Sequence, residues 1–482
     1  MAPRSLYILL LPLASFGAAT DSGVVAEAAK HRDSSAVREL LQARADVNAP
    51  QKDGATALHW AAHWSDIEMT ALLLAAGARV SAADDHGVTP LSLACVNANA
   101  ALVRTLLDAG ANPNARLSTG ETPIMTAART GNPEVVRLLL ARDADVNAKE
   151  GLRGQTALMW GAAERHPEIV RILLEKRAEV SARSKGGFTA LLFAVQQGDV
   201  ETAGILLDAG ADVNDSGPEG PGGDTNGVRP SRANAKASAL VLAIDSDQEA
   251  MARFLLERGA DPNQHGAGHT ALHSAVQRAM PGLAKALLAR GANPNARLED
   301  SMPALSRLIL QQNGMEIDVR GATPFWLAAD YGDVEMMRLF AAAGANALLA
   351  TNDGTTPLMA AAGVDFIEGQ DRYGRRWFQD TTMPLQLRAL EAVKLAIELG
   401  GNVNAANVNG QTAMHGAAYM GSNLLTQFLF DHGANLNPRN KRGQTPYFIT
   451  QGTYQAGSFI VRKETGDLLR GLGADTSLQG AQ

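Results

Sequence analysis

The chain has 482 residues, too many for one hydrophobic core, so several domains or a repeat array are expected. Its net charge of −7 comes without any basic run, which disfavours a nucleic-acid partner. The single cysteine, Cys95, excludes intrachain disulfides and a cysteine-rich zinc module, and its place in a pair of small residues predicts a buried apolar side chain.

The first twenty residues have the order of a secretory signal. One arginine precedes an apolar run, Leu6 to Leu13, and small residues follow. We expect residues 1–19 to be a signal peptide cleaved after Ala19, so that the mature protein is exported to a periplasm or the extracellular space. The alternative is an uncleaved N-terminus on an intracellular scaffold. The apolar run is too short to cross a bilayer, and we expect no membrane span in the mature chain.

From residue 53 onward one ten-residue phrase recurs, as DGATALHWAA at 53–62, DGTTPLMAAA at 353–362 and NGQTAMHGAA at 409–418. Its threonine, once a serine, returns at intervals of 32 to 34 residues except at three insertions. These residues are Thr56, Thr89, Thr122, Thr156, Thr189, Ser238, Thr270, Thr323, Thr356, Thr412 and Thr445.

Each position of the phrase predicts a local structure. A glycine two residues before the threonine suits a turn with positive φ, and the threonine suits a helix N-cap. Proline or alanine follows at the first helical position, and then a pair of small residues. A second helix with a leucine pair comes next, and a glycine about 21 residues after the threonine ends it in left-handed conformation. Each unit is therefore a turn and two short antiparallel helices.

The hexamers TALHWA, TALHSA and TAMHGA resemble the T-P-L-H-x-A signature of ankyrin repeats. The resemblance implies an all-α solenoid of about twelve helix–turn–helix units with β-turn or hairpin connections and three long insertions. With its signal-like start and insertions, the chain resembles exported bacterial members of that family. We expect a degenerate N-terminal cap at 20–52, repeats at 53–214, 237–297 and 321–478 with a degenerate C-terminal cap, a flexible Gly/Pro-rich insertion at 215–236, and further insertions at 298–320 and 363–388.

In ankyrin-repeat proteins the concave face, formed by hairpin tips and first helices, is where partner proteins dock. The resemblance places the contact positions directly after the small pair, where we expect no packing role. Trp64, Arg129, Tyr331 and Tyr419 are the expected anchors, although Trp64 and Tyr419 equally fit a role in shielding adjacent units. The positions are His63 and Trp64, Val96 and Asn97, Arg129 and Thr130, Ala163 and Glu164, Gln196 and Gln197, Asp245 and Ser246, Gln277 and Arg278, Asp330 and Tyr331, and Tyr419 and Met420.

No nucleophile elbow or phosphate-binding loop is present, and the repeats leave no room for a catalytic domain. We therefore predict a monomeric, non-enzymatic scaffold for a partner protein, without a cofactor. Metal- or small-ligand-dependent activity remains as an alternative at the 363–388 insertion or at His265, His269 and His273. The insertion gathers acids, bases and aromatics, which fit a salt-bridged lid, a partner-contact loop or an active site; its contact candidates are Arg372, Tyr373, Arg375, Arg376 and Trp377.

Overall fold

The computed structural model describes residues 23–217, 237–265, 268–299, 319–364, 383–455 and 458–477. The predicted signal peptide with Ala19 lies outside the described residues, as do the insertion contacts Arg372, Tyr373, Arg375, Arg376 and Trp377. Most of the 215–236 and 298–320 insertions lie outside them too. The chain forms two compact units, residues 1–179 and 180–482.

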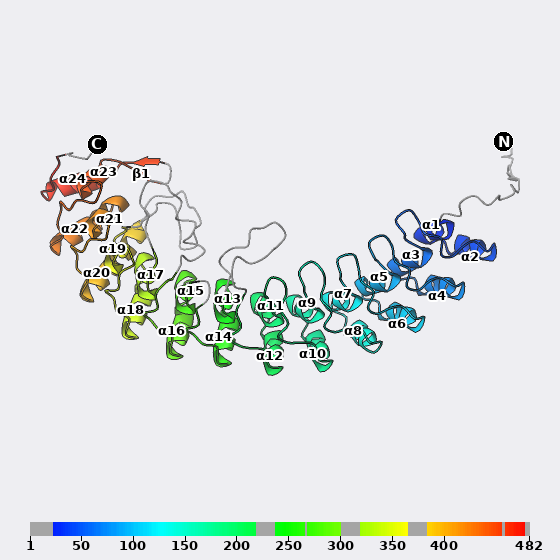
Figure 1. Ribbon diagram of the computed structural model, residues 1–482. Helices are drawn as coiled ribbons and strands as arrows, with labels where there is room; N and C mark the ends of the chain where they lie inside the picture. The colour runs from blue at the N-terminus through cyan, green and yellow to red at the C-terminus, as the bar shows by residue number, and fades with distance from the viewer. Residues whose placement is uncertain are drawn as a thin grey trace, which may run out of the picture. The chain divides into compact units, whose positions relative to one another are not determined.

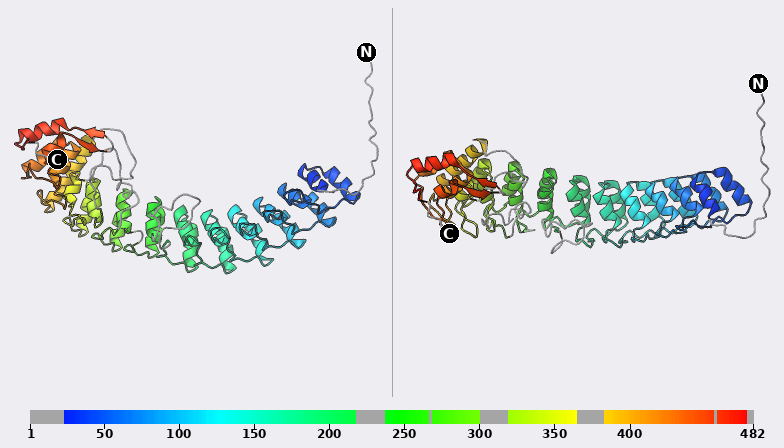
Figure 2. Two further views of the ribbon diagram at one scale, coloured as in Figure 1. Left: turned by 45° about the horizontal axis from the view of Figure 1, so that its top comes forward. Right: turned by 90° about the horizontal axis from the view of Figure 1, so that it is seen from above.

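Unit 1 is built of two layers of short helices (Figure 1). The odd-numbered helices pack against one another in chain order, and each contacts the even-numbered helix that follows it. Figure 2 shows the same two rows from other directions. The helices are α1 (Val24–Lys30), α2 (Ser34–Gln42), α3 (Ala57–His63), α4 (Ile67–Ala75), α5 (Pro90–Val96), α6 (Ala100–Asp108), α7 (Pro123–Thr130), α8 (Pro133–Leu140), α9 (Ala157–Ala163) and α10 (Pro167–Glu175).

Unit 2 repeats this arrangement, again with first helices packed on first helices. Its helices are α11 (Ala190–Gln197), α12 (Val200–Asp208), α13 (Ala239–Asp245), α14 (Glu249–Glu257), α15 (Ala271–Gln277), α16 (Pro281–Ala289), α17 (Pro324–Asp330), α18 (Val334–Ala342), α19 (Pro357–Ala361), α20 (Met383–Glu398), α21 (Ala413–Met420), α22 (Asn423–Asp431), α23 (Pro446–Thr450) and α24 (Lys463–Gly471). Two short antiparallel strands, β1 (Thr453–Gln455) and β2 (Ser458–Ile460), lie before α24.

The predicted N-cap positions of the first helices are confirmed, although the Thr122 hydroxyl makes no capping hydrogen bond. All eleven residues of the threonine series precede a first helix as its N-cap, in extended backbone conformation. The residues that end the second helices adopt left-handed conformation, for example Gly77 at φ 88° and Gly210 at φ 94°. Where this position is Asp143 or Arg177, the backbone is left-handed all the same. The first helix of each repeat thus begins, and the second ends, at a residue whose backbone conformation the local sequence specifies.

Small and branched side chains fill the space between the helices. Alanines of the small pair, such as Ala61 and Ala62, are fully buried, and leucines such as Leu73 and Leu106 of the second helices are buried with them. Cys95, in the place of the second alanine, is fully buried as predicted. Its thiol pKa is raised by burial, so it stays protonated and apolar at neutral pH.

The structure departs from the expected frame at two insertions. Helix α20 begins at Met383, so residues 383–388 of the predicted 363–388 insertion are helical. The helix has 16 residues, whereas most other second helices have nine, because extra turns precede the usual start. In the 215–236 insertion, Ser216 pairs with Ser238, which keeps residues 215–217 within the hairpin.

Candidate binding surface

In three repeats a histidine links the threonine cap to the next repeat. The Thr56 N–H and hydroxyl donate to His59 Nδ1 at 3.1 and 2.9 Å, and His59 Nε2 donates to the carbonyl oxygen of Val88 in the following repeat at 2.9 Å. The Thr270–His273 and Thr412–His415 pairs repeat this geometry. The predicted bond between these histidines and their threonines is therefore confirmed.

This geometry requires a neutral ring, because Nδ1 accepts while Nε2 donates. Burial lowers the pKa of His273 to about 3 and that of His415 to about 4, and it lowers the pKa of His59 as well. A proton on Nδ1 would face two donors inside the protein. These three histidines are consequently structural links between repeats.

The exposed side of the first helices of unit 1 is here called the first-helix face. It comprises Lys30, Arg32, Trp60, His63, Trp64, Leu93, Val96, Arg129 and Trp160. An aromatic cluster lies at its α1 and α3 end. The rings of Trp60, His63 and Trp64 meet edge to face, with centroids 5.7 and 4.6 Å apart. The Lys30 ammonium lies 5.5 Å from the Trp60 ring centroid, and the Arg32 guanidinium lies 5.7 Å from that of Trp64. Cations therefore stack on both tryptophans.

A second cation–aromatic pair lies on the same face at α7 and α9. The Arg129 guanidinium lies 5.6 Å from the Trp160 ring centroid. The guanidinium also reaches Glu121, at 3.5 Å. Between the two aromatic sites, α5 exposes half of Val96, and Leu93 is half-buried. The first-helix face thus has an apolar centre with a cation-stacked tryptophan at either end.

Several predicted contact positions also hold neighbouring repeats together, so the expectation that they have no packing role is wrong. The Trp64 indole N–H donates to the Lys30 carbonyl oxygen at 3.1 Å. The Asn97 amide donates to the carbonyl oxygens of Ala62 and His63, and the Thr130 hydroxyl donates to that of Cys95. These side chains reach back one repeat because the helix ends are close enough for a single hydrogen bond. Exposure and packing coexist at these positions.

The predicted positions in unit 2 differ in exposure. Gln196 and Gln197 are exposed like Glu164 in unit 1, whereas Asp245, Ser246, Arg278, Asp330 and Tyr331 are half-buried. Gln277, Tyr419 and Met420 are buried, with at most 6% exposed, which contradicts their expected place on an open surface. Tyr419 belongs to a buried cluster with Ala418 of its own helix and Ile449 of the next repeat. The Tyr419 side chain therefore shields adjacent repeats.

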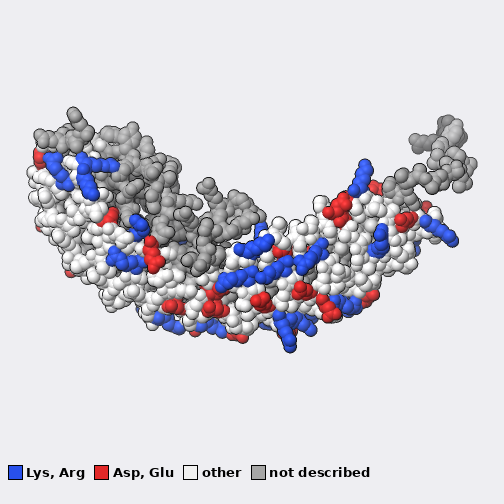
Figure 3. Space-filling model, viewed as in Figure 1, with Lys and Arg blue, Asp and Glu red and all other residues white. Residues whose placement is uncertain are grey.

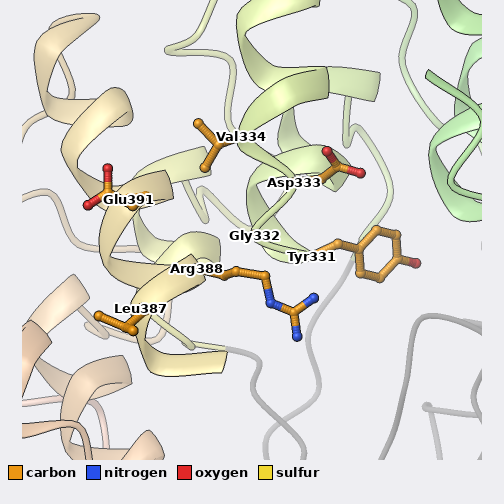
Figure 4. Close-up of a pocket in the computed structure, with 7 residues that line it drawn as sticks. All are labelled: Tyr331, Gly332, Asp333, Val334, Leu387, Arg388 and Glu391. Carbon is orange, nitrogen blue, oxygen red and sulfur yellow. The ribbon is translucent and has the colours of Figure 1, made fainter. Parts of the chain in front are cut away.

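A hollow of about 510 Å³ lies in unit 2, where the added turns of α20 face the turn between α17 and α18 (Figure 4). The lining has both signs of charge. The Asp333 carboxylate has a structural role, since it caps α18 by accepting from the Met336 N–H at 3.2 Å. The lining residues are Tyr331, Gly332, Asp333, Val334, Leu387, Arg388 and Glu391.

Each of the histidines considered as an alternative metal site lies against another residue. His273 belongs to a cap, His269 lies against Asp245 with Nε2 and Oδ2 3.3 Å apart, and His265 lies 3.6 Å from Glu299. In the described part of the chain, no three His, Cys, Asp or Glu side chains are grouped so that they could hold a metal ion.

Charges on the second-helix layer of unit 1 are paired across repeats. Arg104 contacts Glu134 and Arg137 contacts Glu168, both at 2.8 Å. Figure 3 shows blue and red side chains alternating along the edge that carries the even-numbered helices. Among the described residues, none of the helices has both the length and the apolar character that crossing a bilayer requires.

Trp60 and Trp160, which lie four residues after their threonines, were not predicted from the sequence, although both belong to the aromatic part of the first-helix face. Trp64 follows the small pair and was predicted as a contact residue, and an i, i+4 step along the helix brings Trp60 to the same side. The recurrence of tryptophan at the same place in two repeats was the available signal.

A family model described as ankyrin repeats (3 copies) matches residues 25–117, 124–216 and 223–298, and one described as ankyrin repeat matches residues 320–352 and 409–441. These matches cover more than half of the chain. The chain is 36% identical over 164 residues to Neurogenic locus notch homolog protein 1 of Homo sapiens, covering 31% of this chain and 6% of that protein. It is 29% identical over 126 residues to Rabankyrin-5 of Mus musculus, covering 24% of this chain and 11% of that protein.

Proposed function

The chain belongs to the ankyrin-repeat family, and from that premise we propose that it is an exported, non-enzymatic scaffold that binds a partner protein through the first-helix face of unit 1. Ankyrin repeats imply a scaffold for protein–protein interaction. The matched segments form a small part of both relatives, so the activities of those whole proteins are not carried over. Fold alone does not name a partner, and the surface has to supply that argument.

The exposed aromatic and apolar side chains of the first-helix face support this proposal most directly. Trp64 is 41% exposed and Val96 is 52% exposed, on consecutive repeats. Tryptophan and arginine contribute most to the binding free energy of protein interfaces, and Arg32 stacks on Trp64. On the second helices α6, α8 and α10, by contrast, exposed charges such as Arg104 and Arg137 are already paired with carboxylates of the next repeat. A partner would therefore gain more by covering the first helices.

Site-specific photo-crosslinking tests this function. A photoreactive amino acid placed at Val96 reports on the first-helix face, and the same group at Arg38 on α2 reports on the opposite layer. We expect a defined protein adduct from position 96 and none from position 38. Equal labelling at both positions, or no adduct at either, would count against the proposal.

Export is the second element of the proposal and rests on the order of residues 1–19. Intact-mass measurement of the protein from its native host checks it, since cleavage after Ala19 leaves Thr20 as the first residue. A full-length mass would favour the intracellular alternative. Elemental analysis of the same sample tests the metal-dependent alternative, because stoichiometric zinc or iron would contradict a scaffold without a cofactor.

A further inference from the structure

The first-helix face also indicates what kind of segment it binds. Its cations are placed over tryptophan rings, so each keeps one side against an aromatic surface and the other toward solvent. Within the described residues, no carboxylate lies within ion-pair distance of Lys30 or Arg32. Both cations are therefore available to a carboxylate brought by a partner, in a setting partly shielded from water by the indole rings.

Two carboxylates in this part of unit 1, Glu27 and Glu121, already have partners. Glu27 accepts from His31 at 2.9 Å and from Gln51 at 2.6 Å. Glu121 accepts from Thr126 at 2.8 Å and is 3.5 Å from Arg129. Beyond this pair, Glu164 is exposed after α9 and would repel an acidic side chain. The cations stacked on this face therefore lie at its two ends, Lys30 and Arg32 at or just after the end of α1 and Arg129 on α7, and Arg129 also lies 3.5 Å from Glu121.

The apolar centre lies between these two ends. Val96 on α5 is more than half exposed, and Leu93, one turn earlier on the same helix, is half-buried. Apolar side chains of a partner would cover this centre and remove its surface from water. A partner that carries charge throughout its length would leave the centre unmatched.

We propose that the first-helix face of unit 1 binds an extended acidic polypeptide segment, with carboxylates at both ends and apolar side chains between them. One end reaches Lys30 and Arg32, and the other reaches Arg129. Packed helices lie about 8–10 Å apart, and α1 and α7 are separated by three such steps. At about 3.3 Å per extended residue, the segment needs about eight or nine residues. This inference rests on the proposed function and specifies its partner.

The full chain and a fluorescein-labelled nonapeptide, EDELVLEDE, provide the test by fluorescence anisotropy. Two control peptides separate the contributions: KRKLVLKRK reverses the charges, and EDESGSEDE removes the apolar centre. We expect the first peptide to bind more tightly than either control. Its affinity should fall as salt rises, because the charges involved are near the surface.

Matched variants locate the site. Arg32→Glu and Arg129→Glu should each weaken binding about fivefold or more at low salt, and Val96→Ser should weaken it without changing its salt dependence. Arg38→Glu, the same charge change on α2, should leave the affinity unchanged. Equal effects of Arg32→Glu and Arg38→Glu, or equal affinity for the acidic and basic peptides, would overturn the inference. A protein adduct at Val96 combined with no preference for the acidic peptide would refute the partner class alone, and no adduct would refute the proposed function.

Discussion

The Nε2 atom of His59 lies 2.9 Å from the carbonyl oxygen of Val88, so one imidazole ring joins the cap of its own repeat to the turn of the next. His273 and His415 make the same link to Ala322 and Gln444. Each ring must be neutral to accept at Nδ1 from its threonine. The stability of the repeat stack is therefore coupled to pH.

The first prediction concerns that pH dependence. In the unfolded chain these histidines have a pKa near 6.5, whereas in the fold burial lowers the pKa of His273 to about 3 and of His415 to about 4. The unfolded state thus binds more protons between these values, so stability is fully present above pH 6.5 and is lost as the pH falls toward 4. Each histidine contributes a slope of at most about 1.4 kcal/mol per pH unit.

Urea unfolding followed by circular dichroism between pH 7.5 and 4.5 measures this slope. Serine occupies the same position at Ser92, where it donates to the Thr89 carbonyl oxygen at 2.7 Å. A triple His59→Ser, His273→Ser, His415→Ser variant should therefore fold, with a lower urea midpoint at pH 7.5 and a flatter pH profile. A slope as steep as that of the parent protein would contradict the histidine link.

The second prediction concerns an asparagine that joins hairpins. Asn114 accepts from the Asp145 N–H at 2.7 Å and donates to the Asp143 carbonyl oxygen at 3.0 Å. Ser81 holds the equivalent place one repeat earlier and only accepts, from the Asn112 N–H at 3.1 Å. Asn114→Ala should lower the free energy of unfolding by about 1–2 kcal/mol, and Ser81→Asn should raise it by about 0.5 kcal/mol. Asn114→Ser should fall between the parent and the alanine variant in urea midpoint; no difference between serine and alanine would contradict the accepting bond.

Repeat frame, caps and helix ends could be predicted because each depends on residues within a few positions of one another. Side-chain burial could not be predicted in the same way. Gln277 and Tyr419 are buried at a position that is exposed at Val96 and Gln196, and Met420 is buried at the one that is exposed at Gln197. Identical places in the repeat can therefore have different environments.

Trp326 shows that different residue types at one position of the repeat can also make the same contact. It stands three residues after Thr323, where other repeats have histidine, and its indole N–H donates to the Thr355 carbonyl oxygen at 2.9 Å. The side chain is fully buried. A different residue type thus makes the histidine's link to the next repeat. Sequence comparison by residue type alone treats this position as a departure, whereas the hydrogen bond shows that the link is kept.

The third prediction compares two glycines of unit 1 with similar backbone angles. Gly77 has φ 88° and Gly120 has φ 83°. A Cβ at Gly77 would have no atom within 4 Å, whereas one at Gly120 would lie 2.6 Å from the Gly151 backbone nitrogen. Gly77→Ala should cost about 1 kcal/mol of stability through left-handed strain alone. Gly120→Ala must also displace the next hairpin, whose Gly151 N–H donates to the Thr119 carbonyl oxygen at 2.7 Å.

We therefore expect a clearly larger fall in urea midpoint for Gly120→Ala than for Gly77→Ala, by at least about 1 kcal/mol in free energy of unfolding. Gly120→Asn, which tolerates the left-handed angle but keeps a Cβ, should resemble the alanine variant. If Gly77→Ala were as costly as Gly120→Ala, backbone strain rather than hairpin contact would dominate at both positions.

The last prediction concerns two tryptophans at the same place in their repeats. The Trp60 indole N–H donates to Gln51 Oε1 at 2.8 Å. Trp160 has Gly151 at the place of Gln51, and its buried N–H finds no acceptor within the part of the chain that the structure describes. A cation stacks on each ring, so a change to phenylalanine perturbs that contact at both sites.

Leaving a buried donor without a partner costs about 1–3 kcal/mol, and Trp160→Phe removes that cost together with some packing. Its free energy of unfolding should be unchanged or higher, whereas Trp60→Phe should lower it by about 1 kcal/mol. In Gln51→Ala the Trp60→Phe change should become as mild as Trp160→Phe, and a persistent difference would show that packing, not the indole hydrogen bond, separates the two sites.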